Sequence, residues 1–524
     1  MSAPSGGRRR IMLCGDPVIS LDEPAVVPDG AVVIEGNRVV DVGPRTTLER
    51  RHGPVSEVLG GADHIVLPGL INAHSHTGPS LGPGLFDEVF EKVSIHMGPG
   101  NGPVPPELVR LRVMATLLDA IRCGQTAMVD FNYGRWGMPW FAWDVVLDAY
   151  REIGIRVGLG VVFRDQNRYA HEPDDTFLRR FEPDVARGLR ASRIGYAWPI
   201  DEVTTAFTRL ADEWHGRDER IHVIVAPDWT PACSDALYQS CRRLADEYDT
   251  VMSTHVLETR SEMIWNLRTH GVVATRRLAD LGVLGPDVSF AHFVWATDED
   301  IRILADTGVV AVTNPGSNLR LSSGIARLRD IMDAGGRVAI GTDAISFSDR
   351  EDLLVELRLA AYLARTPHSF ESCRLDSLDL LRAMGDHGAA ALGWPGELGR
   401  LAPGCLADAV VLDSARILHP RGRYDSTPIL DVLLDRADHT DVVHVIVNGN
   451  VIVHDRIVTT VDEAEIRTAI DGAIEATGPP TEAVREGRKI SRLAAAELAS
   501  IYEPWYEVPL EPASIYNVRI PPRP

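Results

Sequence analysis

Short apolar runs alternate with helical patterns through the centre of this chain, and no other feature restricts the fold as strongly. The runs predict strands at 66–76, 125–131, 155–163, 221–229, 250–258, 288–295, 309–315 and 337–344. Apolar periodicity predicts helices between them, among them 106–122, 140–153, 234–248, 297–307 and 351–365. Strands that alternate with helices build parallel sheets, and eight of them fit a (β/α)8 barrel of the TIM type. A doubly wound open sheet is the alternative, but its usual glycine-rich phosphate motif is missing after the first strand.

Further strand patterns flank the barrel on both sides. A hairpin pattern surrounds Gly36-Asn37, and strand-like runs return at 407–412 and 442–453. The predicted domains are a composite β-sandwich from 11–66 and 396–460, a barrel over 67–395, and a C-terminal part over 461–524. That last part is expected to hold helices at 462–476 and 483–501, followed by an extended arm from Glu503, because prolines oppose a helix there.

Composition excludes several classes of partner. The 524 residues are 45% hydrophobic and 24% charged, as in soluble globular proteins. A net charge of −21 argues against binding nucleic acid or an anionic membrane surface. We find no signal peptide or membrane span, and the six cysteines form no C-x-x-C pair. A cytoplasmic location is therefore expected.

Two histidines end the first predicted strand. Alternate side chains of a strand point to the same face, so His74 and His76 leave the strand end side by side. Neutral imidazoles held in this way can bind one divalent metal ion. The alternative is that both are ordinary polar residues at a strand end.

Other potential ligands follow at the ends of later strands. Strand five ends with His255 and Glu258, strand six contains His292, and strand eight ends with Asp343. Each has a simpler explanation: His292 could be a hydrogen-bonded core histidine, and Asp343 could cap the next helix. However, the carboxyl ends of barrel strands meet at one rim, where function gathers. All of these residues together therefore favour a shared metal site.

These residues resemble a known group of enzymes. The run Pro68–His76 (PGLINAHSH), the His255-x-x-Glu258 pair, His292 and the GTD that ends at Asp343 resemble the amidohydrolase superfamily. They are most similar to its mononuclear branch of amino-heterocycle deaminases and triazine-type chlorohydrolases. The GCLAD run at 404–408 and the VNG run at 447–449 also resemble the closing sheet of that superfamily. The likeness extends from about residue 11 to about 460.

The resemblance implies a role for each residue. The metal ligands would be His74, His76, His255 and Asp343, a donor set that suits Zn²⁺, although Fe²⁺ would also fit. The catalytic residues would be Glu258 as proton shuttle, His292 near the reacting centre, and Asp343 as acceptor of a proton from water. Binuclear relatives use a carbamylated lysine at strand four, but residues 221–229 contain none, and Lys92 and Lys489 lie outside the strands. One metal ion is therefore expected.

The implied activity is hydrolytic deamination of a small molecule, an amino-substituted N-heterocycle or cyclic amidine. Alternatives are hydrolysis of a ring C–N bond, as in imidazolone-type hydrolases, or displacement of another leaving group such as chloride. Outside the enzyme class, the barrel could be inactive and serve as a binding protein. The resemblance also implies a homo-oligomer, commonly a dimer.

Two segments depart from the family pattern. Residues 313–319 lack the His-Cys-Pro run often found at strand seven, and the loop at 77–84 lacks the usual Met and Arg. Since barrel loops carry specificity, an unusual substrate is expected. Candidate substrate-binding residues at strand ends are Asn132, Arg164, Trp229 and Asn318. Arg164 could bind a substrate carboxylate or phosphate, or it could form a salt bridge.

Overall fold

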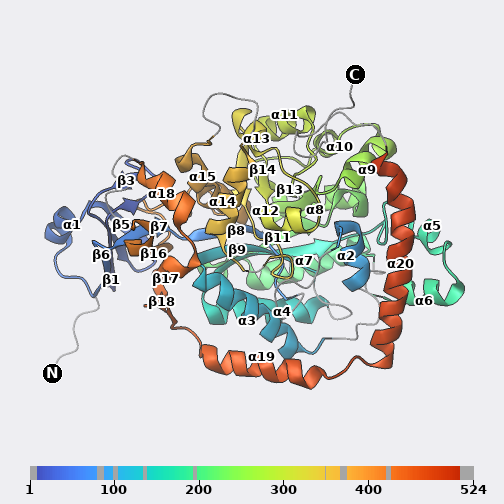
Figure 1. Cartoon of the computed structure of the whole chain (residues 1–524), viewed down its shortest axis with the longest axis horizontal. Helices are drawn as coiled ribbons and strands as arrows, with labels where there is room; N and C mark the ends of the chain where they lie inside the picture. Colours follow the sequence, from blue (N-terminus) through green and yellow to red (C-terminus); the bar gives the residue numbers. More distant parts are fainter. Residues whose placement is uncertain are drawn as a thin grey trace.

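The computed structural model describes residues 9–78, 88–97, 104–133, 139–192, 197–348, 350–365, 374–420 and 427–507. Within them, eight parallel strands pair in chain order and form a barrel (Figure 1). These strands are β8 (Leu70–Ser75), β9 (Gln125–Asn132), β10 (Arg156–Phe163), β11 (Ile221–Pro227), β12 (Met252–Val256), β13 (Val288–His292), β14 (Val310–Thr313) and β15 (Arg337–Ile340). A parallel bridge between Ser75 and Asp343 brings the first and last strands together. The predicted fold class is thus confirmed.

Helices surround the barrel and close its amino end. The helices between and after the strands are α2 (Phe90–Met97), α3 (Pro106–Arg122), α4 (Pro139–Ile153), α5 (Asp174–Leu178), α6 (Pro183–Ala191), α7 (Ile200–Trp214), α8 (Asp235–Glu247), α9 (Arg260–His270), α10 (Ala274–Asp280), α11 (Asp298–Thr307), α12 (Pro315–Arg320), α13 (Leu328–Asp333), α14 (Leu353–Leu363) and α15 (Ser377–Met384). The next helix, α16 (Asp386–Leu392), packs small residues against the interior positions Ile71 and Val310. The amino end is therefore filled, and the opposite rim is left for a site.

Two small sheets lie beside the barrel. The first has the order β5-β4-β1-β6, from β1 (Arg10–Gly15), β4 (Gly30–Glu35), β5 (Arg38–Pro44) and β6 (Glu57–Gly61). The second has the order β19-β18-β17-β16-β7-β2-β3, from β2 (Val18–Ile19), β3 (Val26–Val27), β7 (His64–Pro68), β16 (Ala409–Asp413), β17 (Val442–Val447), β18 (Asn450–His454) and β19 (Ile457–Val458). Short helices α1 (Arg45–His52), α17 (Ser414–Ile417) and α18 (Ile429–Arg436) accompany them. Both ends of the chain contribute to the second sheet, and Leu13, Val66 and Val411 share one buried core.

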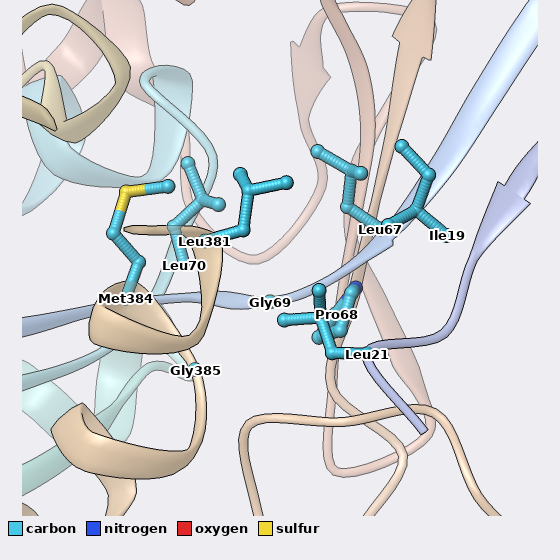
Figure 2. A pocket seen from close by; sticks show the side chains of 9 residues that line it. All are labelled: Ile19, Leu21, Leu67, Pro68, Gly69, Leu70, Leu381, Met384 and Gly385. Carbon is cyan, nitrogen blue, oxygen red and sulfur yellow. The ribbon is translucent and has the colours of Figure 1, made fainter. Parts of the chain in front are cut away.

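The prediction of one continuous strand at 66–76 is wrong, because the segment is divided. It is two strands, with β7 in the small sheet, β8 in the barrel, and Gly69 between them. A Cβ at Gly69 would lie 2.1 Å from the Thr126 Oγ1, so only glycine fits where the chain crosses β9. Apolar patterning misses this break because both pieces are buried. A small apolar pocket lies at the crossing (Figure 2), lined by Ile19, Leu21, Leu67, Pro68, Gly69, Leu70, Leu381, Met384 and Gly385.

A buried ion pair joins the barrel to the second small sheet. The Arg156 side chain, at the start of β10, lies 2.7 Å (Nε to Oδ2) from Asp408, the residue before β16. Both side chains are almost completely buried. Because each charge is removed from water, each needs the other as partner.

Two helices follow the small sheet, α19 (Glu463–Thr477) and α20 (Glu482–Tyr506). The extended arm predicted from Glu503 is wrong for its first residues, since α20 continues through Pro504 to Tyr506. Contacts of Tyr502 and Tyr506 with the barrel stabilise this last turn despite the proline. The rest of the predicted arm, 508–524, lies outside the described residues. In the part of the chain that is described, no helix has the length and apolar character needed to cross a membrane.

Candidate active site

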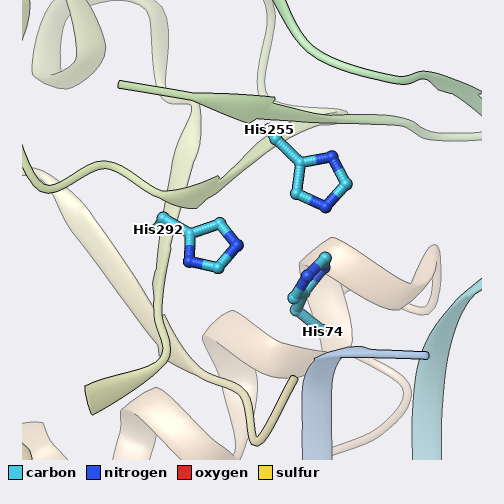
Figure 3. Close-up of side chains that lie close together, drawn as sticks. All are labelled: His74, His255 and His292. Atoms are coloured by element: carbon cyan, nitrogen blue, oxygen red, sulfur yellow. The ribbon is translucent and has the colours of Figure 1, made fainter. Parts of the chain in front are cut away.

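The carboxyl rim of the barrel brings the histidines and acidic residues of the sequence motifs together. Two groups of potential ligand atoms lie within 4.8 Å of one another: His74 with His255 and His292, and His74 with His76 and Asp343. The imidazoles of the first group, from β8, β12 and β13, point toward one another (Figure 3). The His76 Nε2 lies 3.4 Å from the His255 Nε2 and 3.5 Å from the Asp343 Oδ1. The site therefore combines ligands from four strand ends.

Backbone carbonyls orient two of these imidazoles. The Nδ1 of His76 lies 2.8 Å from the carbonyl oxygen of Phe131, and the Nδ1 of His255 lies 2.6 Å from that of Asp228. A carbonyl only accepts, so each Nδ1 carries the proton and each Nε2 keeps a free lone pair. Fixing the tautomer in this way is the usual preparation of a histidine for metal binding.

His74 has the clearest signature of a metal ligand. Its side chain is completely buried, and neither ring nitrogen has a hydrogen-bond partner among the described residues. Burial, together with the nearby His76 and His255, lowers the pKa of His74 well below its usual value, so the ring is neutral. An unpartnered buried nitrogen is costly unless something binds it. These observations fit a divalent cation between the imidazoles and Asp343.

Asn318, one of the predicted substrate-binding residues, contacts His292. Its Oδ1 accepts a hydrogen bond from the His292 Nδ1 at 2.8 Å, while the Asn314 Nδ2 lies further away at 3.3 Å. The Nε2 of His292 then faces the Glu258 Oε2 at 3.7 Å and the Asp343 Oδ2 at 3.9 Å. His292 also has a left-handed backbone with φ of 71°, a strained conformation that is common at functional sites.

Glu258 is a buried acid without a local partner. Its side chain is 1% exposed, and neither carboxyl oxygen has a hydrogen-bond partner in the described part of the chain. Burial is the main cause that raises the pKa of Glu258 well above its usual range, and the charges of Asp343 and Glu262 add to it. Burial therefore favours the protonated form of this carboxyl group, which is the form that can donate a proton.

The carboxylate of Asp343 is held from two sides. The Ser317 Oγ donates to Oδ2 at 2.6 Å, and the Ala344 N–H donates to Oδ1 at 2.7 Å. Sequence reasoning missed Ser317 and also Asp228, whose carbonyl orients His255. Asp228 could have been noticed as a polar residue directly after a strand. However, it orients His255 through its backbone carbonyl, and any residue type could supply that group.

The other predicted substrate-binding residues have structural partners. Arg164 forms an ion pair with Asp228 (Nη2 to Oδ2, 2.7 Å), so its charge is already balanced. The ring of Trp229 packs 4.8 Å from that of His171. The carbonyl of Asn132 accepts from the Trp143 Nε1 at 3.2 Å. Of the loop expected to carry specificity, 79–84 lies outside the described residues.

Comparison with known proteins agrees with this geometry. The sequence profile of the amidohydrolase family matches residues 65–452, and one for an imidazolonepropionase-like composite domain of bacteria matches residues 30–53. The chain is 31% identical to a 5-methylthioadenosine/S-adenosylhomocysteine deaminase of Thermococcus kodakarensis over 80% of this chain and 89% of that protein. It is 28% identical to a 5'-deoxyadenosine deaminase of Methanopyrus kandleri over 86% and 95% of the two chains.

Solved structures share the fold. An adenosine deaminase from Xanthomonas campestris with bound zinc superposes with a TM-score of 0.76 at 25% identity, covering 90% of this chain and 99% of that one. The atrazine chlorohydrolase of Arthrobacter aurescens, complexed with zinc, has a TM-score of 0.76 at 24% identity, over 88% and 100%. With the profile covering most of its length, the chain belongs to the amidohydrolase family and is a hydrolase that acts on carbon–nitrogen bonds.

Proposed function

We propose that this amidohydrolase deaminates an amino-substituted N-heterocycle or cyclic amidine by hydrolysis and releases ammonia. The observation that carries the proposal is the buried carboxyl group of Glu258, whose pKa is raised and whose Oε2 lies 3.7 Å from the His292 Nε2, at the edge of the imidazole cluster. The deaminase names of the similar sequences support it and suggest a purine nucleoside as the first substrate class to test.

The ion that we propose for this site is a single Zn²⁺ held by His74, His76, His255 and Asp343. Three imidazoles and one carboxylate suit zinc, and Fe²⁺ is the alternative. The absence of lysine from β11 argues against a lysine-bridged pair of metals. When bound, such an ion lowers the pKa of a coordinated water toward neutrality.

The residues of this chain would move the protons. Asp343, oriented by Ser317 and Ala344, accepts the proton of the attacking water at a carboxylate oxygen. His292 presents Nε2 toward the reacting carbon, and Asn318 maintains its orientation. Glu258 donates its proton to a ring nitrogen of the substrate and then takes up the hydroxyl proton of the adduct, while the proton held by Asp343 passes to the amino group, which leaves as ammonia. Acid–base work of this kind accelerates reactions about 10²–10⁴-fold.

Two other hydrolytic reactions are the alternatives to deamination, namely opening of a ring C–N bond and displacement of chloride. The imidazolonepropionase-like match covers residues 30–53, which form β4, β5 and α1 outside the barrel, so it carries no information on the barrel chemistry. The likeness to the chlorohydrolase concerns the fold. Ammonia release from aminopurine nucleosides, compared with chloride release from chlorotriazines and ring opening of imidazolones, separates the three reactions. A chain without metal and without turnover would favour an inactive binding protein.

The decisive variant is Glu258→Gln, which keeps the shape of the side chain but removes its transferable proton. We expect turnover to fall about 10²–10⁴-fold while zinc per chain, measured by mass spectrometry, stays constant. Glu247→Gln, on the exposed end of α8, is the matched control. Normal turnover in Glu258→Gln would overturn the assignment. The homodimer and the cytoplasmic location stay predictions, and light scattering tests the first.

A further inference from the structure

The C-terminal helix α20 lies outside the residues matched by the family profile and runs along the elements that follow three barrel strands (Figure 1). Ser491 donates from Oγ to the carbonyl of Ile95 in α2 at 3.1 Å, and Glu497 pairs with Arg180, after α5, at 3.3 Å. Apolar residues of α20, α2, α5 and α6 form one buried cluster, which includes Ile95, Phe177, Leu189, Ala494, Leu498 and Tyr502. The helix therefore holds the segments after β8 and β10 together.

The last turn of α20 makes polar contacts beside the active site. The Tyr506 Oη donates to the Glu91 Oε1 at 3.2 Å, and the Arg260 Nη1 donates to the Tyr506 carbonyl at 2.8 Å. Glu91 belongs to α2 and Arg260 begins α9, so Tyr506 contacts segments that follow both β8 and β12. Tyr502, one turn earlier, accepts from the His171 N–H at 2.8 Å.

A chain of hydrogen bonds leads from Tyr506 to the first turn of α9. The Ser261 Oγ donates to the Glu91 Oε1 at 2.6 Å and lies 2.8 Å from the Thr259 Oγ1. Thr259, the residue after Glu258, caps α9 by accepting from the Glu262 N–H at 3.2 Å. The side chains of Glu91, Ser261 and Thr259 are buried, and hydrogen bonds limit movement most strongly in such surroundings.

The backbone of Glu258 is held within the same turn. Its N–H donates to the Glu262 Oε2 at 2.9 Å, and the preceding Leu257 has a left-handed φ of 57°. A leucine in that conformation is unfavourable and persists only where the surroundings impose it. The position of the Glu258 carboxyl relative to His292 therefore depends on how firmly this turn is held.

We propose that the last turn of α20 is a positioning element for Glu258, and that Tyr506 acts through Glu91 and Ser261 on the first turn of α9. The inference rests on the proposed function, because it assumes that Glu258 transfers protons. Tyr506 itself touches no reacting atom. A helix beyond the barrel would thus set the rate of the acid–base step.

The test is Tyr506→Phe, which removes one hydroxyl from a side chain that is 46% exposed and so should fold normally. We expect kcat to fall about tenfold, the effect of one hydrogen bond worth about 1.4 kcal/mol, with KM and zinc content unchanged. Ser261→Ala cuts the same chain at its other end and should give a similar loss. Tyr362→Phe, an exposed tyrosine in α14, is the matched control.

A double variant distinguishes positioning of Glu258 by Tyr506 from a general contribution of Tyr506 to the stability of the fold. In a Glu258→Gln background, Tyr506→Phe should cause no further loss of the residual turnover, because the residue on which it acts no longer transfers a proton. A tenfold loss that persists in this background, or an unchanged kcat in the single variant, would overturn the inference. If Glu258→Gln alone leaves turnover normal, it is the proposed function that fails instead.

Discussion

Replacing Glu351 by glutamine should change the pH dependence of stability. Glu351 is completely buried behind the strand ends that carry His74 and Asp343. Its Oε2 accepts from the Thr342 Oγ1 at 2.5 Å and from the Asn72 Nδ2 at 3.2 Å. Burial is the main cause that raises the pKa of Glu351 from 4.5 to about 8. At neutral pH the folded protein therefore keeps this carboxyl protonated.

The sign and size follow from proton linkage. Between pH 4.5 and about pH 8, the folded chain retains a proton at Glu351 that the unfolded chain has lost. The free energy of unfolding therefore decreases as pH rises, by about 1.4 kcal/mol per pH unit from this group. Over the interval of 8 − 4.5 = 3.5 pH units, this amounts to about 5 kcal/mol. A glutamine resembles the protonated form at every pH and has no such loss.

Urea unfolding of both proteins at one-unit steps from about pH 5 to about pH 8 measures the difference. Relative to wild type, Glu351→Gln should become steadily more stable as pH rises. Other buried carboxyls with raised pKa, such as Glu356 and Glu262, are present in both proteins, so they cancel. A difference in stability that is constant over this range would refute the reasoning.

The remaining predictions concern the metal site, a buried ion pair and packing. His74→Ala should lose bound zinc, and chelation of the wild type should abolish turnover that added zinc restores; metal per chain and ammonia release measure both. Asp408→Asn should lower the free energy of unfolding by about 3–5 kcal/mol, because it leaves the buried Arg156 charge without its counter-ion. Gly69→Ala should cost about 1–3 kcal/mol, since the new methyl group would overlap Thr126. Urea unfolding measures the last two.

For each of these variants, one result would contradict the prediction. Full zinc content in His74→Ala would remove this residue from the proposed ligands. Wild-type stability of Asp408→Asn would mean that solvent reaches the ion pair. For Gly69→Ala the control is Gly472→Ala, in α19, where an added Cβ meets nothing within 4 Å and should be tolerated.

Local sequence patterns were sufficient to predict the regular helices and strands. They failed to predict features that depend on contacts between distant parts of the chain. The helix predicted at 106–122 is observed with the same bounds, because its signals lie within the segment itself. The break at Gly69 depends on Thr126, and the continuation of α20 past Pro504 depends on Glu91 and His171. These partners are far away in the sequence, so no local window contains them.

Local patterns of the sequence are sufficient to predict the barrel and the residue types of its rim, because strand periodicity and the placement of histidine and acidic residues at strand ends are local properties. Which ring nitrogens are free depends on the folded chain, since the carbonyls of Phe131 and Asp228 that orient His76 and His255 belong to other strand ends. The folded chain also raises the pKa of Glu258 above its usual range. That shift comes from burial and from neighbouring carboxylates, and both exist only once the chain has folded.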